Sequence, residues 1–113
     1  MNNGPMSDVD LDLNALARVG TALSDDTRRR LLVALVDGPA YPAELAERLE
    51  LSRSNVSNHL ACLRGCGLVL AVAEGRRVRY ELIDARLAHA LTDLCAMSIE
   101  PTDDCGPVAE VAS

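Results

Sequence analysis

The stretch LSRSNVSNHLACLRGCGLV, residues 51–69, decides the fold of this chain. Ser52 opens it, apolar residues follow at helical spacing, and Gly65 and Gly67 close it. Serine is a favoured residue at the N-cap of a helix, and glycine is common just beyond a helix C-terminus. We therefore predict a helix over residues 53–65.

The three faces of this predicted helix differ in chemistry. At 100° per residue, Val56, Leu60 and Leu63 share one apolar stripe that should face the core. A second face is small, polar and basic, and side chains of these types donate hydrogen bonds to phosphates and base edges. We interpret this face as a DNA-recognition surface, although such a face is often only solvated. Its residues are Arg53, Ser54, Ser57, Asn58, Ala61 and Arg64.

The third flank carries Cys62 and Cys66, together with His59 and Asn55. Side chains four residues apart on a helix have Cβ atoms about 5–6 Å apart. Two thiolates at this spacing can bind one metal ion at about 2.3 Å each. Cysteine is also a common small buried residue, so the residues alone leave packing and metal binding both open. His59 by itself is more typical of a structural or DNA-side residue than of a metal ligand.

Outward from this helix, periodicity and turn residues predict the rest of the fold. A hairpin turn is expected around Glu74, Gly75, Arg76 and Arg77. The order of elements is that of a winged helix-turn-helix, mainly α (α-α-α-α-β-β-α). We expect a domain over residues 11–98, a disordered segment over 1–10 and a flexible tail over 99–113. The predicted helices cover residues 11–23, 42–49, 53–65 and 84–98, and one more helix runs from a cap within residues 24–26 to residue 37. The predicted strands cover residues 68–73 and 78–82.

The charge distribution favours DNA as a partner despite a net charge of −6 over 113 residues. Residues 51–82 carry a net charge of +3, and this one basic block coincides with the predicted recognition helix and hairpin. The chain has no lysine, so every phosphate contact from a charged side chain must come from arginine. Arg76 and Arg77, at the hairpin tip, are therefore candidate DNA contacts.

The composition also narrows the location and chemistry of the protein. No apolar run approaches the roughly 18 residues that a membrane span needs, and the first residues carry no signal-peptide core. We expect a cytoplasmic protein without a membrane partner, in which cysteines serve as metal ligands or redox thiols rather than disulfides. The Cys-x-x-x-Cys spacing is not that of a redox enzyme, and no small-molecule substrate site is visible, so we expect no enzyme.

The first and last predicted helices are apolar over wide stripes. A small helical core has little surface with which to cover both of them. We expect burial in a two-fold homodimer, the alternative being that the stripes pack on the core of the same chain.

Four segments resemble the ArsR/SmtB family of metal-sensing repressors, over about residues 11–98. They are LSDDTRRRLL (23–32), ELAERL (44–49), SNVSNHL (54–60) and GLV (67–69). The resemblance implies a dimer that binds double-stranded operator DNA and releases it when metal binds. Within the family, residues 57–69 are most similar to cadmium- and lead-sensing members.

That similarity also implies a ligand set and an inducer. It assigns metal-binding thiolates to Cys62, Cys66 and Cys105, the last contributed by the partner protomer. The implied inducer is Cd²⁺ or Pb²⁺, ahead of arsenite or Zn²⁺. Alternatives are an arsenite-responsive repressor of the same fold and a thiol redox-responsive regulator.

The sequence departs from the family at several positions. Glu50 stands where glycine is usual in the helix-turn-helix turn. The Cys-x-Cys pattern of arsenic-type sites is absent from the third helix, and His89 lacks the partners that zinc-type sites have on the last helix. Cys95 has no motif partner, and we expect it to be a packed residue.

Overall fold

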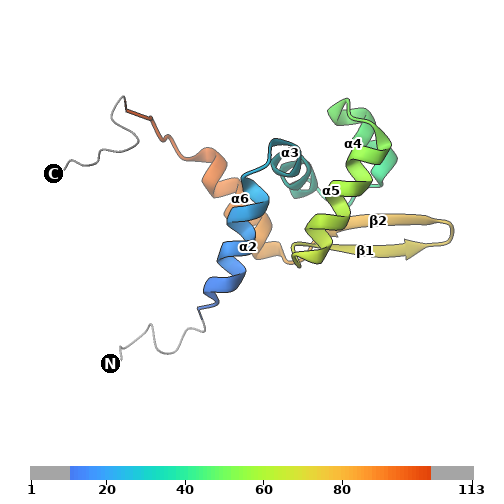
Figure 1. Ribbon diagram of the computed structural model, residues 1–113, viewed down its shortest axis with the longest axis horizontal. Helices are drawn as coiled ribbons and strands as arrows, with labels where there is room; N and C mark the ends of the chain where they lie inside the picture. Colours follow the sequence, from blue (N-terminus) through green and yellow to red (C-terminus); the bar gives the residue numbers. More distant parts are fainter. Residues whose placement is uncertain (1–10, 103–113) are drawn as a thin grey trace.

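The computed structural model describes residues 11–102, and within them the chain forms five helices and one antiparallel hairpin (Figure 1). This order confirms the predicted winged helix-turn-helix. The elements are α2 (Leu13–Leu23), α3 (Asp26–Val36), α4 (Pro42–Leu49), α5 (Arg53–Gly65), β1 (Val69–Glu74), β2 (Arg77–Leu82) and α6 (Ala85–Ala96). The described chain contains no helix long and apolar enough to span a membrane. Residues 1–10 and most of the expected tail, including Cys105, lie outside the described residues.

Short polar side chains define where four of the helices begin. Each accepts a backbone N–H from the first turn of its helix, which satisfies a donor that has no partner within the helix. Ser52 does so for α5 as predicted, with a 3.1 Å bond from the N–H of Asn55. The other N-caps are Asp12 for α2, Asp25 for α3 and Asp84 for α6.

The boundaries of five elements differ from the prediction by one or two residues, since α2 begins at Leu13, α3 ends at Val36, and both strands and α6 also shift. Helix α6 ends at Ala96 because Met97 adopts an extended backbone, so the helix stops before Ser98 and well before Pro101. Serine and isoleucine are weaker helix formers than alanine or leucine, and neither Ser98 nor Ile99 is buried against the rest of the chain. Strand β1 lies one residue nearer the turn than predicted and β2 begins one residue earlier, which leaves only Gly75 and Arg76 between them.

The turn between α4 and α5 requires a left-handed residue, and Glu50 takes that conformation with φ 56° and ψ 51°. Its N–H donates to carbonyls of the last turn of α4. A residue with a Cβ pays a modest cost in this region, which glycine avoids. The departure noted in the sequence is therefore a real conformational cost at the helix-turn-helix turn.

The core gathers around α3 and the buried stripe of α5. Val56, Leu60 and Leu63 are completely buried, which confirms the predicted inward face of the recognition helix. They pack with Leu31 and Leu45 from the two preceding helices. This packing fixes the rotation of α5 about its own axis, and hence the direction of its other two faces.

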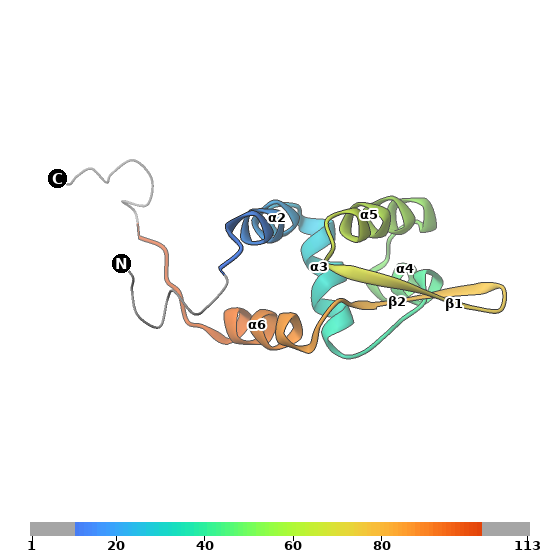
Figure 2. The same ribbon diagram turned by 90° about the horizontal axis from the view of Figure 1, so that it is seen from below.

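Helices α2 and α6 pack on opposite sides of α3, at the end of the molecule away from the hairpin (Figures 1 and 2). Both helices keep a strongly exposed apolar stripe in the single chain. On α2, Leu13 is 72% and Leu16 65% exposed; on α6, Leu94 is 52% exposed, and Met97, just beyond the helix end, is 54% exposed. The alternative that the core of the same chain covers these stripes does not hold.

Candidate nucleic-acid interface and thiol pair

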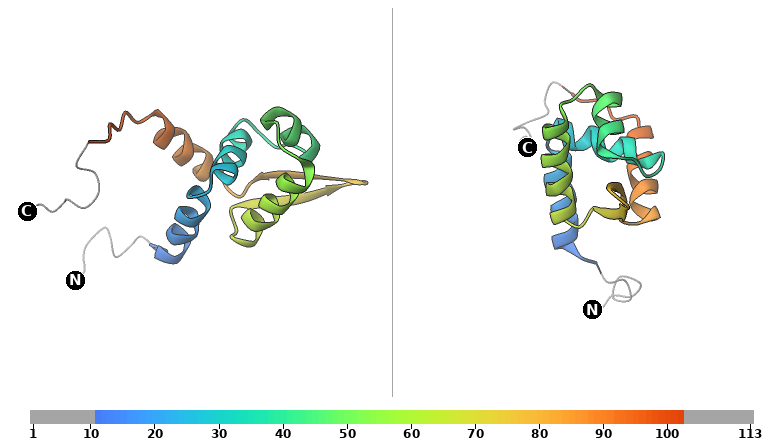
Figure 3. Two further views of the ribbon diagram at one scale, coloured as in Figure 1. Left: turned by 45° about the horizontal axis from the view of Figure 1, so that its top comes forward. Right: turned by 90° about the vertical axis from the view of Figure 1, so that its right-hand side faces the viewer.

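The polar face of α5 is open to solvent along its whole length. All five predicted DNA-contacting residues on this face are exposed, and α5 itself lies beside the projecting hairpin (Figure 3). They are Arg53, Ser54, Ser57, Asn58 and Arg64. An exposed helix face of this composition, next to a projecting hairpin, has the shape and the donors that a major groove accepts.

His59 was also predicted to contact DNA, but it lies on a different flank of α5. Its Nδ1 is 3.8 Å from Oδ2 of Asp25, and its side chain is only 24% exposed. Asp25 is the N-cap of α3, and the hydrogen bond from the Arg28 N–H is the main reason that the pKa of its carboxyl lies below the ordinary value. The described structure therefore places His59 against the start of α3, away from the exposed polar face.

The hairpin is tied to the start of α4 by a cluster that we call the wing clamp, formed by Tyr41, Glu74, Arg77 and Arg79. The Tyr41 hydroxyl donates to Glu74, which raises the pKa of that hydroxyl, and Arg79 pairs with the same carboxylate at 2.7 Å. The Arg77 guanidinium stacks on the Tyr41 ring, with Cζ 3.4 Å from the ring centroid. Arg76, in the turn itself, is exposed. Both predicted wing arginines are exposed, but the side chain of Arg77 is held against the Tyr41 ring.

Cys62 and Cys66, which we call the thiol pair, lie in the last turn and at the C-cap of α5. Both are free thiols; Cys62 is exposed, whereas Cys66 is half-buried and packs against the core. The N–H of Cys66 donates to the carbonyl of Cys62 at 3.0 Å, so helical geometry holds the two residues together. The two side chains therefore differ in environment, since Cys62 is open to solvent and Cys66 lies partly against the core.

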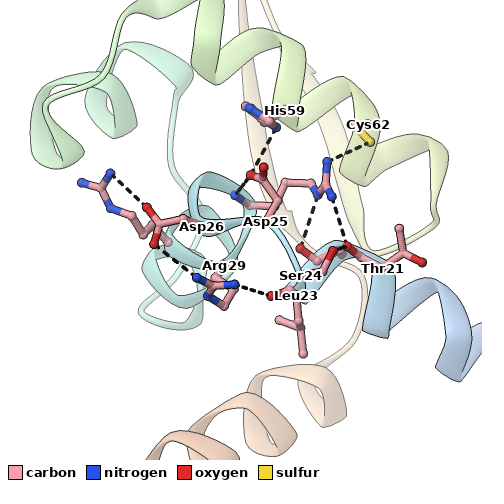
Figure 4. A network of polar contacts seen from close by, with 11 residues as sticks. Thr21, Leu23, Ser24, Asp25, Asp26, Arg29, His59 and Cys62 are labelled. Atoms are coloured by element: carbon pink, nitrogen blue, oxygen red, sulfur yellow. Dashed lines mark hydrogen bonds and ion pairs between the residues drawn. The ribbon is translucent and has the colours of Figure 1, made fainter. Parts of the chain in front are cut away.

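Two arginines contact the thiol pair, and neither was predicted from the sequence. Arg28 Nη1 donates to the sulfur of Cys62 at 3.9 Å, a contact drawn in Figure 4. Arg18 Nε donates to the carbonyl oxygen of Cys66 at 3.0 Å. These partners are 34 and 48 residues apart in the chain, and no local pattern in the sequence marks such pairs.

The thiol pair suits a soft divalent ion, since two free thiols four residues apart match the ligands that Cd²⁺, Pb²⁺ and Zn²⁺ take. Within residues 11–102, no group of three or more His, Cys, Asp or Glu side chains comes together. Cys105, which the sequence predicts as a third ligand, lies outside the described residues.

Cys95 and His89 lie on α6 and are both exposed. The expectation that Cys95 is packed is wrong for the single chain, because the hollow between α3 and α6 that it lines with Val33 and Leu91 stays open. Neither residue adds a ligand to the thiol pair within the described chain.

Comparison with known proteins gives one consistent result. Residues 25–70 match the family described as bacterial regulatory protein, arsR family. The HTH-type transcriptional regulator CmtR of Mycobacterium tuberculosis is 58% identical over 100 residues, which cover 88% of this chain and 85% of that protein.

Two solved structures extend this similarity to the fold. The NMR structure of the cadmium metal-sensor CMTR from Mycobacterium tuberculosis matches with a TM-score of 0.67 at 58% identity, covering 83% of this chain and 98% of that one. A homodimeric winged helix-turn-helix DNA-binding domain from Mycobacterium bovis, a possible ArsR-family transcriptional regulator, matches with a TM-score of 0.68 at 29% identity. That match covers 74% of this chain and 77% of the Mycobacterium bovis chain.

Proposed function

Because this chain belongs to the arsR family of bacterial regulatory proteins, we propose that it is a homodimeric transcriptional repressor that releases its operator when a soft metal ion binds. The observation that carries the proposal is the position of the thiol pair. Cys62 and Cys66 lie on the helix that presents the DNA-contacting face, so one rigid element serves both ligands. Binding of the two ligands is therefore coupled, and each weakens the other by the same factor.

Operator binding is proposed to use α5 and the hairpin together. Arg53, Ser57 and Asn58 face outward from α5 and suit base edges and phosphates, while Arg76 suits the backbone beside the groove. Two copies of α5 in a two-fold dimer would enter major grooves about one helical turn apart. With no lysine in the chain, the cationic contacts are all guanidinium groups.

The dimer is proposed to form through α2 and α6. Their exposed stripes contain Leu13, Leu16, Leu94 and Met97, and they lie at the end opposite the hairpin. Apolar surface of this extent is normally buried against a partner. This arrangement leaves both recognition helices free to face DNA, and the homodimeric relative from Mycobacterium bovis has the same fold.

We propose that the metal site consists of the thiol pair and Cys105 of the partner subunit. The ion supplies strong bonds to sulfur, and a thiolate-only site favours Cd²⁺ or Pb²⁺ over hard ions such as Mg²⁺. Helix α6 runs away from the end of α5 in both Figure 1 and Figure 2. Its 12 residues add about 18 Å of length, and this direction supports a third thiolate that comes across the dimer.

The test is cadmium titration of the wild type and three single variants, Cys62→Ser, Cys66→Ser and Cys105→Ser, with Cys95→Ser as the matched control. Absorption from sulfur-to-cadmium charge transfer reports binding. Fluorescence anisotropy of an operator duplex, selected from random DNA with the metal-free protein, reports release. We expect the two helix variants to lose both signals and Cys105→Ser to lose release more than absorption.

Three outcomes would contradict the proposal. Wild type that binds the duplex but ignores cadmium and lead would remove metal sensing, and release only after oxidant would favour a thiol redox switch. Loss of both signals in Cys95→Ser, with Cys105→Ser unaffected, would replace Cys105 by Cys95 in the ligand set.

A further inference from the structure

Two arginines join the thiol pair to α2, the helix on which dimerisation is proposed. Arg28 reaches the sulfur of Cys62, and Arg18 reaches the carbonyl oxygen of Cys66. Arg18 belongs to α2 itself, whereas Arg28 belongs to the first turn of α3. The C-terminal end of the recognition helix is therefore held from two points at the corner between α2 and α3.

Contacts other than the one with sulfur hold the Arg28 side chain in position. Its Nε donates to the carbonyl of Ala22 at 3.3 Å and its Nη2 to the carbonyl of Thr21 at 3.1 Å. These carbonyls lie in the last turn of α2, where partners within the helix are missing and a positive charge is favoured. The backbone N–H of Arg28 donates to Asp25 at 3.0 Å. The guanidinium thus caps α2 and directs its remaining nitrogen, Nη1, at Cys62 (Figure 4).

In the contact between Arg28 and Cys62, the sulfur is the atom that would also bond to a captured ion. Cys62 Sγ lies 3.9 Å from Arg28 Nη1. Capture requires the sulfurs of Cys62 and Cys66 to bond to one ion together. Cys62 is exposed and free to change rotamer, whereas Cys66 is packed on the core. Any rotation of Cys62 Sγ toward Cys66 is a movement relative to a guanidinium that is anchored to α2.

We propose that Arg28 is a positioning residue that reports the state of the Cys62 sulfur to the C-terminal end of α2. In the metal-free protein, its contacts hold α2 and α5 in the relative position that fits DNA. When the thiol pair closes on an ion, this connection is lost, and Arg18 alone continues to link α2 to the end of α5. The inference rests on the proposed function, because it concerns the coupling between the same metal site and DNA binding.

Arg29, the residue after Arg28, provides a matched control. Arg29 also caps α2, since its Nη1 donates to the carbonyl of Leu23 at 2.7 Å. Its other partner is Asp26 at 3.4 Å, and within the described contacts it touches no cysteine. Arg28→Gln and Arg29→Gln each remove a capping guanidinium from the same helix end, and only the first removes the contact with the thiol pair.

The first experiment needs no metal. Operator affinity is measured by anisotropy for wild type, Arg28→Gln, Cys62→Ala and the double variant. We expect each single change to weaken binding by at least about twofold, and the double change to weaken it no further, because both remove one contact. Thermal unfolding of each variant identifies loss of folding, and Arg28→Lys, which keeps the charge at the helix end, serves if Arg28→Gln is unstable. Additive losses in the double variant would overturn the proposal.

The second experiment measures coupling. The ratio of operator Kd with and without cadmium should fall about 2- to 30-fold in Arg28→Gln, while cadmium absorption is kept. In ¹⁵N-labelled wild type, cadmium should shift the amide signals of Thr21, Ala22 and Leu23, and these shifts should be absent from Arg28→Gln. Arg29→Gln should keep both responses.

An unchanged ratio in Arg28→Gln, or an equal loss in Arg29→Gln, would overturn the role of Arg28 while leaving metal sensing intact. Failure of the wild type to bind cadmium at all would overturn the proposed function instead.

Discussion

Leu16→Ala is the sharpest test of the proposed dimer surface. Leu16 lies on α2 and is 65% exposed in the single chain. Complete burial of a leucine side chain contributes about 1.5–3 kcal/mol, so covering the exposed two thirds contributes about 1–2 kcal/mol. A two-fold dimer contains the substitution twice, which makes the loss about 2–4 kcal/mol. We therefore expect the dimer Kd to rise roughly 30- to 1,000-fold.

The measurement is sedimentation velocity over a dilution series, with Leu70→Ala as control. Leu70 is also an exposed leucine, at 41%, but it lies on β1 in the wing. Its loss should leave the dimer Kd unchanged. If Leu16→Ala stays within about threefold of wild type, or if Leu70→Ala weakens the dimer equally, the assignment of α2 to the interface is refuted. Operator affinity should fall with the dimer fraction, because half of the DNA contacts belong to each protomer.

Three further predictions concern the wing, the helix-turn-helix turn and the start of α6. Arg76→Ala should lower the slope of log K against log salt by about one unit on any DNA sequence, measured by anisotropy at several salt concentrations; an unchanged slope would remove Arg76 from the phosphate contacts. Glu50→Gly should relieve about 1 kcal/mol of left-handed strain and raise Tm by about 4–8 °C in scanning calorimetry, and a lower Tm would contradict this. Hydrogen bonding from the side chain of Arg86 holds the pKa of the Asp84 carboxyl at about 2. The stability that ionised Asp84 contributes should therefore be complete above about pH 4 and lost as the pH falls through 2. In Arg86→Gln, carboxyl NMR titration should find that pKa raised only part of the way, because the backbone N–H of residue 86 still donates to Asp84; no change in the pKa would refute the pairing.

The features that sequence could predict are those that depend on neighbouring residues. The start of α5 followed from Ser52, and its buried stripe followed from the spacing of Val56, Leu60 and Leu63, because capping and helical periodicity act within a few residues. The end of α6 was misplaced, since Pro101 marks a position beyond which a helix cannot continue rather than the place where this one stops.

The polar contacts between distant elements could not be predicted. The partners of Arg28 and Arg77 depend on where long flexible side chains meet after the helices have packed, and their residue types fit many partners equally well. From the sequence, Arg28 belongs only to a segment that resembles the family, and Arg77 only to the predicted hairpin tip. The candidate metal ligands came from spacing and resemblance, whereas the residues that surround them came from the folded structure.

The wing clamp has a consequence for the kinetics of operator release. Tyr41 joins the hairpin to the start of α4, and α4 packs directly on α5, so the wing and the recognition helix are linked through α4. While this link holds, the hairpin and α5 should dissociate from DNA together. We expect each protomer to leave its half-site in a single step, with a single-exponential decay. Tyr41→Phe removes the hydroxyl that bonds Glu74 and should add a second, faster phase to this decay. In that phase the hairpin dissociates from DNA while α5 remains in the major groove.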